Sequence, residues 1–245
     1  MKASNCLQRE FVLRNYETDF RQQIKPSTVL GFFQETAGDH SEEMGLGYKK
    51  LGEKGLFWVL SKIYVEVERR PKYAEKVTVV TWPHEPNKAI YERSFALRDD
   101  RGVAMRAYSR WCILQAGSGR IYPCSRLEQP EIDFISEKSV AFDEWAIPAV
   151  PREGGPSFSL RIANSEYDLN YHVNNIKYAD YVFNCFTVAE LEARKLKSFQ
   201  LHYIKQTHEG DLLEMFRKET APGVFAIEGV KNGEETVVSA RVCFE

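Results

Sequence analysis

Hydrophobic positions in the first half of the chain follow first a helical and then a strand-like period. Core-type residues recur at spacings of three and four, which predicts a helix, at Val29, Phe33, Ala37, His40 and Met44. Ser27 or Thr28 is predicted to cap the start of this helix, and Gly45 and Gly47 to end it. An extended segment at 10–16 precedes it, and runs rich in β-branched and aromatic residues follow at 56–67, 76–83, 89–98 and 103–116. The first half is therefore predicted to have the order β-α-β-β-β-β.

The second half repeats this order. A short strand is predicted at 158–163, and a helix beginning at Asn174 or Asn175 continues to Ala189. Strands are then predicted at 199–206, 212–219, 224–231 and 236–244. The segments 99–102 and 232–233 (Asp-Asp-Arg-Gly and Asn-Gly) predict hairpin turns between the last two strands of each half.

The two halves align without a gap where strand meets helix. Glu17-Thr18-Asp19-Phe20 aligns with Glu166-Tyr167-Asp168-Leu169. A helix packed on an antiparallel sheet, occurring twice, indicates an α+β fold. We predict an N-terminal unit at 1–117, a proline-rich linker at 118–156 and a C-terminal unit at 157–245.

Composition narrows the class of protein. The chain has 245 residues, 43% hydrophobic and 28% charged, with a formal net charge of −2 and a pI near 6.3. This balance argues against a nucleic-acid-binding protein. The five cysteines are scattered without a C-x-x-C pair, so neither a metal site nor a disulfide framework is expected. No apolar run is long enough for a membrane span or a secretory signal, and we expect a cytoplasmic protein.

Three polar residues in the second half could carry chemistry: Asp168, Asn170 and His172. Their spacing of two would point all three side chains the same way from an extended backbone, and a turn there could still bring them together. A histidine can take a proton from water and a carboxylate can stabilise the imidazolium, which together typically accelerate a reaction on the order of 10²–10⁴-fold. Asparagine and the amides of the following helix could bind a carbonyl oxygen. The same residue types are also common in turns and caps, and spacing alone favours that second interpretation.

The string from Asp168 to Tyr178 resembles the D-x-N-x-H-V-N-N-x-x-Y signature of acyl-acyl carrier protein thioesterases, the plastid and bacterial enzymes with a double hot-dog fold. The helix followed by the 56–62 segment, and Trp82 and Trp111, also resemble that family, so the resemblance covers most of the chain. It implies that Asp168, Asn170 and His172 are the catalytic residues. The family's further catalytic carboxylate falls on Gln206, which cannot ionise but can still hydrogen-bond a water or the histidine.

The resemblance implies hydrolysis of a fatty acyl thioester carried on the phosphopantetheine arm of acyl carrier protein, a lipid-metabolism reaction of fatty acid biosynthesis that releases free fatty acid. No cofactor, metal, nucleic acid or membrane partner is expected, and the chain could be a monomer or a homodimer. The C-terminal unit would be catalytic, with Asn174 and Asn175 contacting substrate. The N-terminal unit would bind the acyl chain, and the predicted lining residues are Val29, Phe32, Phe33, Trp58 and Leu60.

Other readings remain open. The substrate could be an acyl-coenzyme A ester. Gln206 makes a non-catalytic acyl-binding module a second possibility, and a hydratase of acyl thioesters is a more distant third. His40 is a minor catalytic candidate and is more readily explained as a packed core residue. Cys112 and Cys185 are interpreted as inert core thiols.

Overall fold

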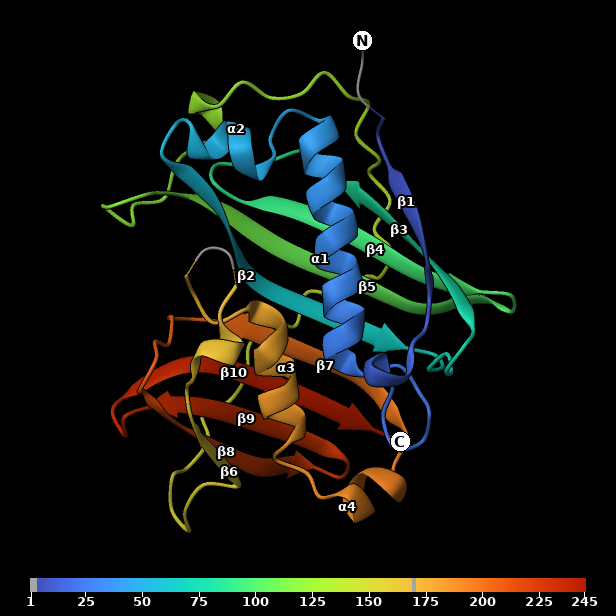
Figure 1. The fold of residues 1–245 in the computed structure, drawn as a ribbon, viewed down its shortest axis with the longest axis vertical. Coiled ribbons are helices and arrows are strands. Elements are labelled where there is room, and N and C mark those ends of the chain that lie inside the picture. The colour runs from blue at the N-terminus through green and yellow to red at the C-terminus, as the bar shows by residue number, and fades with distance from the viewer. Residues whose placement is uncertain (1–3, 169–170) are drawn as a thin grey trace. The chain divides into compact units, whose positions relative to one another are not determined.

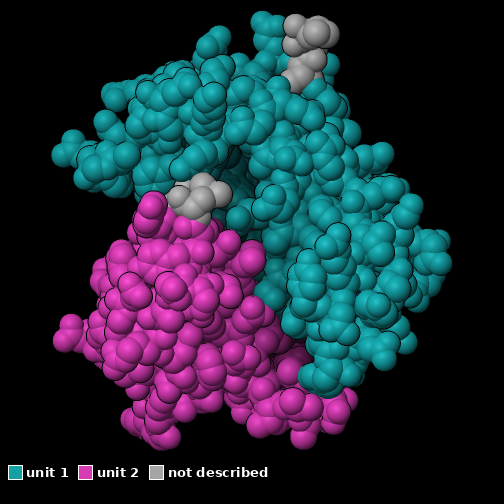
Figure 2. Space-filling view, in the orientation of Figure 1, with its two compact units in different colours: residues 1–142 teal, residues 143–245 magenta. Residues whose placement is uncertain are grey.

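The computed structural model describes residues 4–168 and 171–245 (Figure 1). The chain divides into two compact units, residues 1–142 and 143–245, which Figure 2 shows in different colours. None of the helices in the described part of the chain is long and apolar enough to cross a membrane.

Unit 1 is an antiparallel sheet with one long helix across it. The strands pair in the order β1-β3-β4-β5-β2. Their bounds are β1 Leu7–Val12, β2 Leu56–Val67, β3 Lys76–Pro83, β4 Tyr91–Asp99 and β5 Gly102–Gln115. Helix α1, Pro26–Glu43, lies over this sheet (Figure 1), and the short helix α2, Tyr48–Gly52, follows it. The predicted order of elements in the first half is confirmed.

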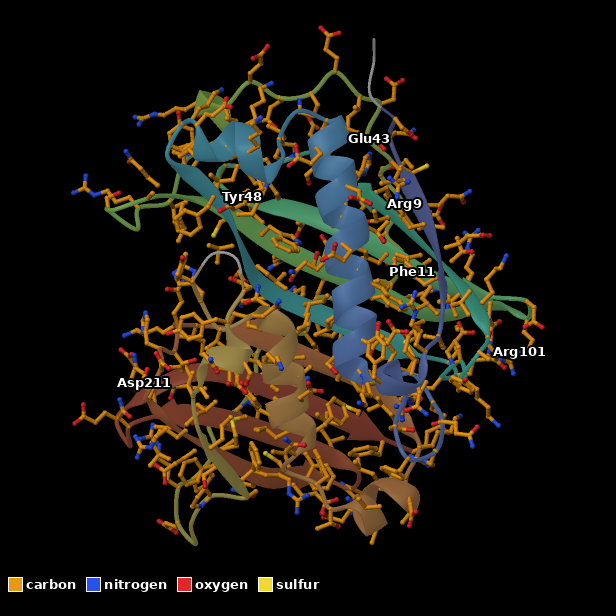
Figure 3. All side chains as sticks on the ribbon, in the orientation of Figure 1. Arg9, Phe11, Glu43, Tyr48, Arg101 and Asp211 are labelled. Atoms are coloured by element: carbon orange, nitrogen blue, oxygen red, sulfur yellow. The ribbon has the colours of Figure 1, made fainter. Side chains whose placement is uncertain are left out.

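Aromatic side chains fix α1 to the sheet. Phe33 stacks on Phe95 of β4 with ring centroids 4.7 Å apart, and Phe32 stacks on Phe11 of β1 at 4.0 Å. At the edge of the unit, Arg9 of β1 pairs with Asp39 at 3.0 Å and lies 3.8 Å from Glu43 of α1 (Figure 3). The helix is therefore held by apolar burial on one face and by exposed ion pairs at its rim.

The predicted cap of α1 was wrong, whereas its predicted end is confirmed. Lys25 is the N-cap and Pro26 the first helical residue, so Ser27 and Thr28 lie inside the first turn. Proline suits this position because the first helical amide has no partner within the helix. Beyond the last helical residue Glu43, Gly45 takes a positive φ of 71°, which ends the helix.

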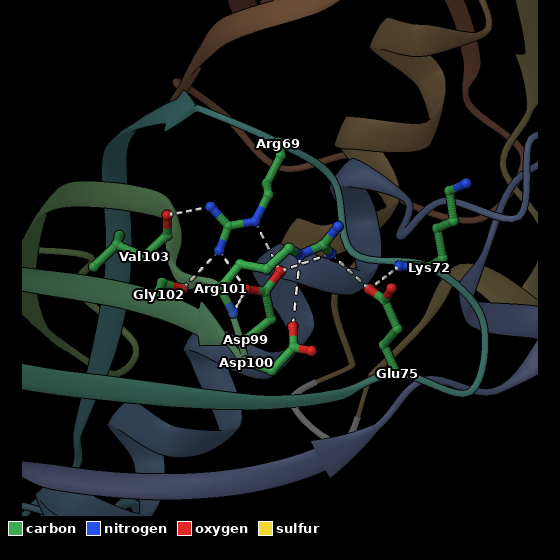
Figure 4. Close-up of polar contacts among 8 residues, drawn as sticks. All are labelled: Arg69, Lys72, Glu75, Asp99, Asp100, Arg101, Gly102 and Val103. Atoms are coloured by element: carbon green, nitrogen blue, oxygen red, sulfur yellow. Dashed lines mark hydrogen bonds and ion pairs between the residues drawn. The ribbon is translucent and has the colours of Figure 1, made fainter.

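An ion-pair network stabilises the predicted β4–β5 hairpin (Figure 4). Asp99 accepts hydrogen bonds from the guanidinium of Arg69 and from the amide of Arg101, and Arg101 also reaches Glu75 at 3.1 Å. The side chain of Asp99 is only 1% exposed. These contacts join the hairpin turn to the segment that follows β2.

Unit 2 repeats the plan with a shorter helix. Its strands pair in the order β7-β10-β9-β8-β6. Their bounds are β6 Phe158–Arg161, β7 Leu196–Tyr203, β8 Leu212–Ala221, β9 Val224–Lys231 and β10 Glu235–Phe244. Both central residues of the predicted turn, Asn232 and Gly233, have positive φ, as the tightest hairpins require.

The prediction of one continuous helix to Ala189 was wrong. Helix α3 spans Asn175–Phe183, and a separate helix α4 spans Val188–Glu192. The break has a local cause, because the Thr187 hydroxyl accepts from the amide of Glu190 while the Glu190 carboxylate accepts from the amide of Thr187. This capping box starts a new helix.

The proline-rich segment at 118–156 contains no helix or strand apart from a 3₁₀ turn at Cys124–Arg126. Its first part packs on unit 1, where the Trp82 indole donates to Glu137 O at 2.8 Å. Its second part packs on unit 2, where the Gln200 amide donates to Trp145 O at 3.0 Å. The boundary between the compact units falls within this segment, after Phe142.

Candidate functional site

The residues Asp168 and His172 close a tight loop just before α3. The Asp168 amide donates to His172 O at 2.9 Å, and the Tyr171 amide donates to Asp168 O at 3.1 Å. Tyr171 has a φ of 58°, in the left-handed region. The backbone is therefore a turn rather than the extended segment that the spacing of two suggested. The turn places Asp168 and His172 opposite each other, both partly buried. The third predicted residue, Asn170, lies outside the described residues.

The same loop occurs in unit 1, as the aligned sequences predicted. There the Asp19 amide donates to Gln23 O at 2.8 Å, and Gln22 has a φ of 59°. The 3₁₀ turns Asn15–Glu17 and Asn164–Glu166 precede the two loops. Unit 1 therefore has the loop geometry, but it carries Gln23 where unit 2 carries His172.

The N-terminus of α3 follows the loop directly. Asn174 is the N-cap, and its side-chain oxygen accepts from the amide of Ile176 at 3.1 Å. The amide of Lys177 donates to Asn174 O at 2.9 Å. Among the described residues, no acceptor is found for the amide of Asn175. That amide could therefore bind a substrate oxygen, supported by the positive end of the helix.

Main-chain hydrogen bonds locate the position of Gln206 within the repeat. The amide of Leu13 donates to Glu75 O at 3.0 Å, and the amide of Ile162 donates to Asp211 O at 2.9 Å. Counting back from these acceptors, Gln206 corresponds to Arg70 of unit 1.

In unit 1 this position contacts the loop aspartate. The guanidinium of Arg70 pairs with Asp19 at 2.8 Å, and both side chains are largely buried. Burial lowers the pKa of Arg70, while the nearby Asp19 carboxylate acts in the opposite direction. In unit 2, Gln206 is exposed, and Lys231 Nζ contacts its carbonyl oxygen at 3.4 Å. Glu209, another polar residue of this segment, is also exposed.

Residues that sequence reasoning did not single out also contact the site. The hydroxyls of Tyr178 and Thr207 hydrogen-bond each other at 2.7 Å in the interior. Tyr203 donates to Asn175 O at 3.2 Å, and the amide of Glu209 donates to the Tyr167 hydroxyl at 2.7 Å. Tyr178 stands in the recognised signature, but its partner is 29 residues away and no local pattern reveals it.

The residues predicted to line the acyl site all belong to unit 1. Val29, Phe33 and Leu60 are fully buried or nearly so, and Phe32 is 8% exposed. Trp58 is half-buried, and its indole donates to Leu46 O at 2.8 Å. These contacts account for the residues as core, and their role in binding an acyl chain stays a prediction.

His40 and Cys185 are buried, and Cys112 is partly buried. His40 is inaccessible to solvent, with Nδ1 3.1 Å from the guanidinium of Arg93 and Nε2 2.9 Å from Ser4 O. Burial lowers the pKa of His40. Burial also raises the pKa of Cys112, and raises that of Cys185 to about 12. Neutral thiols agree with the interpretation of these cysteines as inert.

Comparisons with known proteins place the whole chain in one group. Residues 4–125 match the acyl-ACP thioesterase N-terminal domain, and residues 156–241 match the acyl-ACP thioesterase C-terminal domain. A chloroplastic acyl-[acyl-carrier-protein] hydrolase of Cuphea viscosissima is 25% identical over 241 residues, which is 94% of this chain and 57% of the plant protein. A chloroplastic palmitoyl-acyl carrier protein thioesterase of Arabidopsis thaliana is 27% identical over 84% of this chain and 53% of its own length. The chain thus spans little more than half the length of these relatives.

Solved structures match over nearly the full chain. An acyl-ACP thioesterase from Bacteroides thetaiotaomicron has a TM-score of 0.91 at 26% identity, covering 98% of both chains. A 12:0-ACP thioesterase from Umbellularia californica has a TM-score of 0.83 at 22% identity, covering 98% of this chain and 97% of its own. These matches confirm the predicted α+β double hot-dog fold.

Proposed function

We propose, because the chain belongs to the acyl-ACP thioesterase family, that it hydrolyses the thioester of a fatty acyl-acyl carrier protein and releases free fatty acid. One observation carries the proposal. The loop that occurs in both units bears the Asp/His pair only in unit 2, where it leads directly into the N-terminus of α3. The shared fold does not require this pair, since unit 1 forms the same loop without it.

In the proposed mechanism His172 takes a proton from water, and the resulting hydroxide attacks the thioester carbonyl carbon. Asp168 stabilises the imidazolium that forms, because a carboxylate favours the protonated ring. Asn170 and the amide of Asn175 hold the developing oxyanion. Gln206 orients the water as a neutral hydrogen-bonding group. Collapse of the tetrahedral intermediate breaks the carbon–sulfur bond, and the proton from His172 goes to the leaving thiolate.

The partner in this proposal is acyl carrier protein with its phosphopantetheine-linked acyl chain. Unit 1 would receive the acyl chain, and the C-terminal unit predicted at 157–245 would perform the hydrolysis. The names of the relatives support a carrier-protein substrate. We propose a cytoplasmic enzyme that needs no cofactor.

The test follows thiol release from a panel of acyl-acyl carrier proteins and from the matching acyl-coenzyme A esters. We expect release from the carrier-protein esters, and a loss of 10²-fold or more in His172→Ala, since a general base is typically worth on the order of 10²–10⁴. Gln23→Ala changes the corresponding residue of unit 1 and should retain wild-type turnover. Unchanged release in His172→Ala would remove His172 from the mechanism.

A second candidate function is favoured by Gln206. Because Gln206 cannot ionise and is exposed, a module that binds acyl thioesters without cleaving them would also be compatible with the sequence. No release from either ester panel, with acyl ligand still bound, would support that module. Faster release from the coenzyme A esters would instead identify those as the substrate.

A further inference from the structure

We infer that three tyrosine hydroxyls position the Gln206 segment against the Asp168–His172 loop, and that they are positioning residues for the proposed hydrolysis. We call Tyr167, Tyr178 and Tyr203 the tyrosine clasp. The inference rests on the proposed function, because it assigns to these hydroxyls the alignment of the two parts of that site.

Each hydroxyl of the clasp joins the loop or α3 to the end of β7 or to the segment that follows β7. Tyr167 directly precedes Asp168, and its hydroxyl accepts from the amide of Glu209 at 2.7 Å. Tyr203 ends β7 and donates to the carbonyl of Asn175, the first residue of α3, at 3.2 Å. Tyr178 of α3 pairs with the Thr207 hydroxyl at 2.7 Å. The bonds therefore run in both directions between the two segments.

The clasp brackets Gln206 in the chain. Tyr203 lies three residues before it, and Thr207, which is fully buried, directly after it. Between them, the amides of Ile204 and Lys205 both donate to Val237 O, at 2.9 and 3.2 Å. The backbone of Gln206 is therefore held from the side of β10 as well as from the side of α3. Such support is what keeps a reacting group within a fraction of an ångström of its working geometry.

Unit 1 shows that the fold forms without the clasp. The positions that correspond to Tyr167, Tyr178 and Tyr203 are Thr18, Val29 and Val67, and Thr207 corresponds to Pro71. The Thr18 hydroxyl donates within its own 3₁₀ turn, to Asn15 O at 2.9 Å, and Val29 and Val67 have no hydroxyl. The segments of unit 1 are joined instead by main-chain bonds from Tyr73 N to Gln22 O and from Ile24 N to Pro71 O, both at 2.8 Å, and by the side chain of Arg70. The hydroxyl bonds between the two segments are thus specific to the unit that carries the Asp/His pair.

Tyr181 is a matched control for the buried hydroxyl of Tyr178. Tyr181 lies one turn after Tyr178 on α3, and their rings are 5.7 Å apart. It is buried, but its hydroxyl has no hydrogen-bond partner within the described residues. Tyr178→Phe and Tyr181→Phe therefore remove the same atom from the same helix, and only the first removes a bond to the Gln206 segment.

Steady-state kinetics on acyl-acyl carrier protein would test the clasp in the full-length chain. We expect Tyr178→Phe and Thr207→Val each to lower kcat about 10-fold with little change in KM, and Tyr181→Phe to match wild type. The same substitutions in a Gln206→Ala background should have no further effect, because the clasp acts through that residue. Equal losses in both backgrounds, or no loss at all, would overturn the inference.

A second readout does not need turnover. The ring resonances of His172 in NMR spectra of the folded chain should move in Tyr167→Phe and Tyr178→Phe, and stay in place in Tyr181→Phe. If the wild type shows no hydrolysis, the proposed function fails, but the comparison of His172 resonances still tests whether the clasp positions the loop. Unmoved resonances in all three variants would refute the clasp even if hydrolysis is confirmed.

Discussion

At the residue scale, the structure decides between two geometries that the sequence left open for Asp168 and His172. Alternation by two allowed an extended backbone or a turn, and the positive φ of Tyr171 and the hydrogen bond from the Asp168 amide to His172 O show a turn. The sequence revealed the residue types because the signature is contiguous. The hydroxyl partners of Tyr178 and Tyr203 lie 28 to 29 residues away, and only the folded chain brings them together.

The non-ionisable residue at 206 gives the sharpest prediction at this scale. Gln206→Ala should lower kcat about 10-fold, because the water loses an orienting hydrogen bond. Gln206→Glu should retain turnover at neutral pH and add an acidic limb to the kcat–pH profile, since a carboxyl with an ordinary pKa near 4.3 is a weaker acceptor once it is protonated. The profile of kcat against pH for the three proteins measures this. The wild type has no carboxylate at position 206. Identical profiles in wild type and Gln206→Glu would therefore show that residue 206 does not contact the reacting atoms.

At the element scale, several strand bounds were predicted correctly because alternation and turn residues are local, whereas β1 and β7 each begin three residues earlier than predicted. The strands β2, β3 and β9 begin and end as expected, and the Asn232-Gly233 turn is where its sequence placed it. The break between α3 and α4 was not predicted, because the apolar spacing continues across the break. Thr187 and Glu190 nevertheless have the sequence of a capping box. The capping box, and not the continuing apolar period, determines where α4 begins.

The β4–β5 hairpin supports a prediction about acid stability. Hydrogen bonds from Arg69 and Arg101 lower the pKa of Asp99 to about 2, against burial that acts in the opposite direction. A carboxyl whose folded pKa is depressed stabilises the fold above its unfolded pKa, near 3.8, and this contribution is lost as the pH falls towards 2. Asp99→Asn should therefore cost about 2 kcal/mol at neutral pH and almost nothing near pH 2.

Urea unfolding of wild type and Asp99→Asn across this range measures the difference. Asp100→Asn is the matched control, because Asp100 is 90% exposed and contacts only the edge of the same network, at 3.5 Å from Arg101. It should leave stability nearly unchanged at every pH. A cost for Asp99→Asn that does not vary with pH would show that the ion pair is not its source.

At the scale of the whole molecule, the duplication is the most informative feature. The two units form the same loop, yet the position three residues after the strand that precedes it is Arg70 after β2 and Gln206 after β7. Sequence alignment predicted the repeat and placed the Asp/His pair in unit 2. It did not predict the Asp19–Arg70 pair, because two residues 51 positions apart give no local pattern. Unit 1 thus uses the aspartate for structure, and we propose that unit 2 uses it for catalysis.

Exchanging the two residues would separate these roles. Arg70→Gln leaves Asp19 largely buried without its partner, which should cost about 3 kcal/mol of unfolding free energy. The kcat of the folded protein should stay at the wild-type value. Gln206→Arg should have the opposite effects, because a cation beside Asp168 would form the structural pair seen in unit 1 and withdraw that carboxylate from His172. Thermal unfolding and thiol release, measured on both variants, give the comparison, and a loss of turnover in Arg70→Gln would mean that the loop of unit 1 also serves the reaction.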